Sequence, residues 1–165
     1  MSSAAPASPY SWLGELTANS YKYRGIYRLD DTRIVATDGT AFVVVVSDET
    51  APTIECAEAI ARHIGFEVEK EAVIEFRRLT DWLAALSPLA VDAGTVFGRR
   101  INRHLVKRFV GPLQAKEVMV QYRGFEQAIA FLDVDERWGV YAMPIVERRD
   151  PLGGLELGPV PELIK

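Results

Sequence analysis

The spacing of apolar residues changes twice along the chain, from every second position to every third or fourth and back again. The longest apolar run, residues 41–46, is far shorter than the roughly 20 apolar residues that a membrane-spanning helix needs. Short runs rich in β-branched and aromatic residues, separated by turns such as Thr37-Asp38-Gly39, are typical of antiparallel strands. This pattern predicts strands over residues 23–29, 33–36, 41–46, 117–123, 127–134 and 138–146.

Three segments in the middle of the chain have apolar residues at helical spacing. Residues 54–66, 76–86 and 101–113 are therefore predicted as helices, and a glycine or a proline stands close to the end of each. Residues 91–98 fit neither pattern. Strands near both ends with helices between them indicate an α+β fold with antiparallel sheets, and they argue against alternating βαβ units.

The composition is that of one globular domain with loose ends. The chain has 165 residues, of which 48% are apolar and 25% are charged. We expect a flexible N-terminal segment over residues 1–20, where serine, alanine and proline dominate, a folded domain over 21–147, and a C-terminal tail outside the core over 148–165. The start lacks the basic and apolar stretches of a secretory signal, and the single cysteine, Cys56, fits a reducing cytoplasm.

Motifs that would indicate catalysis are missing from the sequence. It has neither a phosphate-binding glycine loop nor a Gly-x-Ser-x-Gly nucleophile motif. Cys56 and His63 lie two turns apart on a predicted helix, hence roughly 10 Å from each other, whereas a nucleophile and its base need about 3 Å. We expect no catalytic residue, metal or cofactor, although a small enzyme that uses Asp38, His63 or His104 remains an alternative.

Basic residues concentrate in one stretch of a chain whose formal net charge is −4. No acidic residue occurs from Arg99 to Gln114, and on a helix Arg100, Arg103 and Lys107 would share one face. Such a strip favours sequence-independent contacts with the phosphates of double-stranded DNA. The alternative is a solvated helix face whose charges pair with acidic residues elsewhere. The candidate DNA-binding residues are Arg99, Arg100, Arg103, Lys107 and Arg108.

Two short motifs resemble the bacterial DNA sliding clamps, the processivity β subunits of the replicative DNA polymerase. Residues 34–42, with an Ala-Thr-Asp-Gly turn, resemble a strand–turn–strand of these clamps. Residues 138–145, which contain a Met-Pro pair followed by an isoleucine, look like their closing strand. The resemblance covers residues 22–46 and 72–146, and it departs from the family where Thr-Ala follows the turn in place of the usual His-Arg pair.

The resemblance implies a DNA-clamp-like domain in which antiparallel sheets carry helices on one face. In the clamps, the two motifs line an apolar cleft that binds short peptides of partner proteins, and the helices face the DNA with lysine and arginine. The corresponding cleft residues here are Thr37, Gly39, Thr40, Phe42, Tyr141, Met143 and Pro144.

A clamp chain carries three such domains, whereas this sequence has room for one. A ring around DNA would therefore need self-association, for which exposed sheet edges are the expected contact. The resemblance thus implies a non-catalytic, homo-oligomeric module of DNA replication in the cytoplasm. The alternative is a structural or protein–protein interaction protein that keeps a clamp-like fold without binding DNA.

Overall fold

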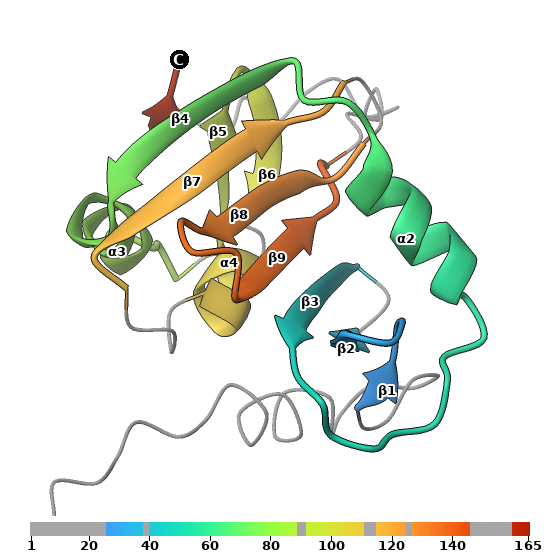
Figure 1. Cartoon of the computed structure of the whole chain (residues 1–165). Coiled ribbons are helices and arrows are strands. Elements are labelled where there is room, and N and C mark those ends of the chain that lie inside the picture. The colour runs from blue at the N-terminus through green and yellow to red at the C-terminus, as the bar shows by residue number, and fades with distance from the viewer. Residues whose placement is uncertain (1–25, 38–39, 89–91, 111–114, 125–126, 146–159) are drawn as a thin grey trace, which may run out of the picture.

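The computed structural model describes residues 26–37, 40–88, 92–110, 115–124, 127–145 and 160–165 (Figure 1). The predicted flexible segment over residues 1–20 lies outside the described residues. No helix in the described part of the chain is long and apolar enough to cross a membrane. The elements are β1 (Tyr27–Arg28), β2 (Arg33–Thr37), β3 (Ala41–Val46), α2 (Ala57–Gly65), β4 (Lys70–Glu75), α3 (Phe76–Ala84), β5 (Ala93–Val96), β6 (Arg99–Asn102), α4 (Arg103–Val110), β7 (Glu117–Tyr122), β8 (Ile129–Asp133), β9 (Trp138–Ala142) and β10 (Glu162–Ile164).

The larger of two sheets joins an early part of the chain to a late part. Its strand order is β1-β2-β3-β9-β8-β7-β4, and all neighbouring strands are antiparallel. β3 pairs with β9, from Ala41 opposite Ala142 to Val45 opposite Trp138. The predicted strand over residues 41–46 is buried at five consecutive positions, because both faces of the sheet are covered at this point.

The smaller sheet is a hairpin with a third strand added beside it. Phe97 and Gly98 join β5 to β6, and their φ angles of 49° and 76° give a two-residue turn that suits the twist of the two strands. β10 pairs parallel with β5, and its Leu163 is buried in the main core. The prediction that residues 148–165 form a tail outside the core is therefore wrong for residues 162–164.

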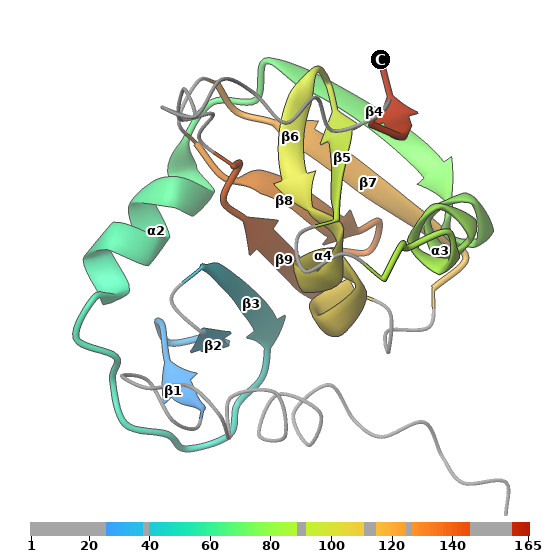
Figure 2. The same cartoon turned by 180° about the vertical axis from the view of Figure 1, so that it is seen from behind.

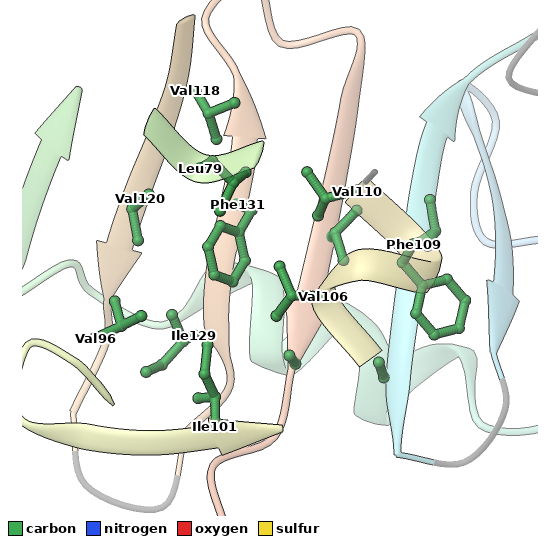
Figure 3. Packing of buried hydrophobic residues seen from close by; sticks show 14 of the residues in the cluster. Leu79, Val96, Ile101, Val106, Phe109, Val110, Val118, Val120, Ile129 and Phe131 are labelled. Atoms are coloured by element: carbon green, nitrogen blue, oxygen red, sulfur yellow. The ribbon is translucent and has the colours of Figure 1, made fainter. Parts of the chain in front are cut away.

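Two apolar clusters lie on opposite faces of the large sheet. α3, α4 and the small sheet cover one face, where Leu79, Val106 and Phe131 are fully buried (Figures 2 and 3). α2 covers part of the other face, where Ile60 belongs to the same cluster as Phe42. The expected packing of helices on one face thus holds for α3 and α4, whereas α2 lies on the opposite face.

The segment predicted as one helix over residues 101–113 begins as a strand. β6 extends to Asn102, and α4 runs from Arg103 to Val110. Ile101 is buried in the main core, although it belongs to β6 and not to α4. In the sequence it was therefore mistaken for the first apolar residue of the helix. The edge strand β4 escaped prediction because most of its positions are exposed and several of them are charged.

Candidate functional site

The two clamp-like motifs lie side by side in the large sheet. Phe42 of β3 stands opposite Tyr141 of β9, and the two rings stack with centroids 4.7 Å apart and an interplanar angle of 12°. Just beyond the strands, the Met143 N–H donates a hydrogen bond to the Thr40 carbonyl oxygen at 3.3 Å. The Thr37 hydroxyl donates to the Ala41 carbonyl oxygen at 2.8 Å. The motifs therefore form one continuous surface, with Gly39 outside the described residues.

This surface is covered, although the resemblance implied an open cleft. The exposed fractions of Phe42 and Tyr141 are 7% and 5%, and Thr37 and Pro144 are buried as well. Ile60 and Ile64 of α2 pack in the same cluster as both rings, and the His63 ring lies 6.2 Å from the Phe42 ring. Of the predicted cleft residues, only Thr40 is exposed and Met143 is half-buried among those described. The chain's own helix thus occupies the face where a cleft was expected.

An open pocket of about 430 Å³ adjoins the covered surface. Val44, Gly139 and Leu132 lie on three neighbouring strands of the same sheet face and line it, together with Tyr141. A Cβ atom on Gly139 would come within 2.8 Å of the Leu132 Cδ2 atom, so the absence of a side chain at Gly139 leaves space at the bottom of the pocket. The sequence offered a signal for this pocket, because Val44 and Gly139 stand two residues from Phe42 and Tyr141 along the same strands.

Charged residues of both signs surround this pocket, next to a neutral tyrosine. Arg33, Arg123 and Arg137 line it together with Asp133 and Glu136, and the Arg137 Nε atom donates to Asp133 Oδ2 at 2.8 Å. Burial raises the pKa of the Tyr141 phenol, against the opposing effect of the positive charges on Arg123 and Arg33. The Arg123 guanidinium lies 5.7 Å from the centre of the Tyr141 ring. The pocket therefore offers an apolar floor with a neutral hydroxyl and a charged rim, on which three arginines stand beside two acidic residues.

Arg103, predicted to contact DNA, is buried instead. Its exposed fraction is 1%, and its Nη1 atom donates to Asp92 Oδ1 at 2.8 Å. A second nitrogen donates to the Trp82 carbonyl oxygen, and the guanidinium lies 5.2 Å from the Trp82 ring centre. Burial alone would raise the pKa of Asp92, but hydrogen bonds from Ser87 and Arg103 and the charge of Arg103 lower it below its usual value. Arg103 is thus a structural residue, and its assignment to a DNA-binding face is wrong.

The other four predicted cations lie at the surface of β6 and α4. Lys107 is exposed, and Arg108, Arg99 and Arg100 are half-buried. His104 is exposed too, and it stands three and four residues before Lys107 and Arg108. These three therefore share the outer face of α4, where sequence periodicity had placed Arg103. Whether this face meets DNA stays a prediction.

Groups that could supply catalysis are scattered over the described residues. Within them, no cluster of three or more histidine, cysteine, aspartate or glutamate side chains could hold a metal ion. Cys56 precedes α2 and His63 lies in its last turn, so the helix holds them apart. Asp38 lies outside the described residues.

Comparison with known proteins supports the fold. No protein-family model and no curated protein matches the sequence. Similar solved structures include the sliding clamps, DNA polymerase III subunit beta, from Bartonella birtlesii and Pseudomonas aeruginosa, each bound to griselimycin, with TM-scores of 0.58 and 0.57 at 11% and 10% identity. The matches cover 84% of this chain and 63% and 64% of the two clamp chains. The clamp from Borrelia burgdorferi, in complex with a natural product, gives a TM-score of 0.56 at 7% identity, with 85% of this chain and 62% of that chain covered. The chain therefore spans less than two thirds of these clamps, and the predicted clamp-like α+β fold is confirmed.

Proposed function

We propose that this chain is a non-catalytic, clamp-like binding module that captures peptide segments of partner proteins and contacts DNA phosphates. The observation that carries the proposal is the pairing of β3 with β9, which joins the two motifs through the stacked Phe42 and Tyr141 rings. In the alternative, the chain is a structural or interaction protein that keeps the fold without DNA binding.

Peptide capture is proposed for the sheet face around Phe42 and Tyr141. This face combines an apolar surface with the open pocket beside it, and Tyr141 belongs to both. Apolar pockets with a few convergent polar groups are the usual form of a binding site. The arginines at the rim would then orient a peptide whose apolar side chains enter the pocket.

DNA contact is proposed for the outer side of β6 and α4. The strand leads directly into the helix, and Arg99, Arg100, Lys107 and Arg108 occur without any intervening acidic residue. Backbone phosphates are the expected target, because lysine and arginine contacts of this kind carry no base information. Self-association would bring several such sides together, and the exposed edge of β4 is a candidate contact between copies.

The DNA part can be tested with a fluorescent duplex in an anisotropy titration at several salt concentrations. We expect the double variant Lys107→Glu/Arg108→Glu to bind about tenfold or more weakly at low salt, with a shallower salt dependence. The matched control is Arg62→Glu/Lys165→Glu, which changes the net charge equally at exposed positions outside β4, β6 and α4. Equal losses of DNA affinity in both variants would show that overall charge, and not this face, accounts for binding. If the unmodified chain does not bind DNA, the alternative of an interaction protein without DNA binding is favoured.

The peptide part can be tested with griselimycin, which the clamps from Bartonella birtlesii and Pseudomonas aeruginosa bind. Isothermal titration should detect binding to this chain, and the variant Tyr141→Ala should weaken it by about tenfold because the ring belongs to both the covered surface and the pocket. Arg77→Ala, an exposed change on the other side of the sheet, serves as the control. Equal affinity of both variants would exclude this face.

A further inference from the structure

We propose that α2 is an internal occupant of the peptide-binding surface, and that a partner segment binds by displacing it. The inference rests on the proposed function, since it assumes that the surface around Phe42 and Tyr141 captures peptides. The partner segment that fits is a short amphipathic helix with two aliphatic residues four positions apart, equivalent to Ile60 and Ile64. Figure 1 shows α2 running along the side of the sheet, from the region of β1–β3 toward the start of β4.

Contacts of α2 coincide with the surface that the two motifs build. Ile60 is buried in the cluster that contains Phe42 and Tyr141, and Ile64 packs against the edge of the same cluster. His63 adds its ring between those of Phe42 and Phe66, at 6.2 and 5.9 Å. An apolar segment from another protein would meet Phe42 and the part of the cluster beneath Ile60 only after α2 has left.

α2 is fastened to the protein by few interactions. Of its nine residues only Ile60 is buried, whereas α3 and α4 bury three and four residues. No side chain caps its N-terminus, and a helix of this length is marginal by itself in water. Elements that bury little apolar surface open at a lower free energy than the whole domain unfolds. We therefore expect α2 to detach while the main core remains folded.

Arg123, directly after β7, holds the far end of α2. Its Nη1 atom donates to the carbonyl oxygens of Ile64 and Phe66, the latter at 2.8 Å, and its Nη2 atom donates to Gln121 Oε1 at 2.5 Å. A cation at a helix C-terminus satisfies carbonyls that have no partner within the helix. A displacing helix would present its own terminal carbonyl groups to the same guanidinium.

The open pocket is the place where a partner segment would bind first. Ile64, Arg123 and Tyr141 all line it, so it begins where the cover of α2 ends. A partner segment can contact Leu132 and Tyr141 there before α2 moves. Because the surface binds only when it is uncovered, the apparent affinity for a partner falls in proportion to the uncovered fraction.

Opening of α2 can be measured without any partner. Cys56 is the only cysteine, stands directly before α2 and packs partly in the same cluster, so its labelling rate with a thiol reagent reports detachment. We expect Ile60→Ala to raise this rate about tenfold or more under native conditions. Arg123→Met, which removes the hydrogen bonds to the helix end, should raise it too. The control Ile101→Ala truncates an equally large side chain in the main core and should leave the rate within about twofold.

Capture of a segment by the uncovered surface is then measured with a fluorescein-labelled synthetic peptide of residues 55–66, with serine in place of Cys56. We expect the peptide to bind the Ile60→Ala chain about tenfold or more tightly than the unmodified and Ile101→Ala chains. The Arg123→Met chain should gain less, because it also lacks the guanidinium that would meet the terminal carbonyl groups of the peptide. A peptide with serine at both isoleucine positions should not bind. An unchanged rate of Cys56 labelling in both the Ile60→Ala and the Arg123→Met chains would overturn this inference alone. Fast labelling without any gain in peptide affinity would overturn the inference together with peptide capture by this face.

Discussion

Replacing Arg103 by alanine should destabilise the fold rather than weaken DNA binding. The substitution leaves the Asp92 carboxylate, which is 7% exposed, without its ion-pair partner. It also removes the donor to the Trp82 carbonyl oxygen and the cation above the Trp82 ring. Removing one partner of a buried ion pair costs about 3–5 kcal/mol. A domain of this kind has roughly 5–15 kcal/mol in all, so the variant should fold but unfold at much lower denaturant concentration.

Urea unfolding followed by tryptophan fluorescence measures this loss. Lys107→Ala is the matched control, since it removes an exposed cation from the same helix and should cost less than about 0.5 kcal/mol. Replacing both partners, as Arg103→Met/Asp92→Leu, should restore most of the stability, because an apolar pair of similar volume leaves no buried charge unpaired. The burial argument is refuted if Arg103→Ala and Lys107→Ala shift the unfolding midpoint equally.

Two further variants test the edges of the fold. Leu163→Ala should lower the free energy of unfolding by about 2–5 kcal/mol in urea, because this side chain is 2% exposed in the main core. An unchanged unfolding midpoint would mean that β10 adds nothing to the stability of the core. Burial tends to raise the pKa of Asp30, but hydrogen bonds from Arg33 and Thr32 outweigh it and lower the pKa to about 2. A lowered pKa stabilises the fold above the unfolded value and loses its effect as pH falls toward 2. Asp30→Asn should therefore lower the free energy of unfolding by about 1 kcal/mol at pH 6, a figure discounted because the carboxylate is 37% exposed. Near pH 2 the substitution should change the free energy of unfolding by almost nothing, and an equal loss at both pH values would contradict this reasoning.

Patterns along the sequence predicted the elements whose burial repeats regularly. The strand over residues 41–46 has the bounds expected from its apolar run, and the helix predicted over 76–86 appears as α3 with Leu79, Trp82 and Leu83 buried. The meeting of the two clamp-like motifs followed from a resemblance of short segments, and the β3–β9 pairing confirms that they are neighbours.

Long-range partners account for most of what the sequence did not predict. Arg103 looked like one more cation in a solvated strip because Asp92, which pairs with it, lies eleven residues earlier in a segment that fitted no pattern. The helical spacing of Ile60 and Ile64 predicted α2 but not the face of the sheet on which it packs. The pairing of β10 with β5 depends on three residues, which are too few for periodicity to reveal.

Joining β3 to β9 closes a loop of about a hundred residues, from Ala41 to Ala142. Such non-local pairing slows folding, because the entropy of closure is lost before the contacts form. During synthesis β3 can pair with β2 early, but its other edge has no strand to pair with until β9 has left the ribosome. Until then the four consecutive valines from Val43 to Val46 stand on an open strand edge, the kind of segment that other chains can join. A strand that lies inside the finished sheet is thus open to aggregation while the chain is being made.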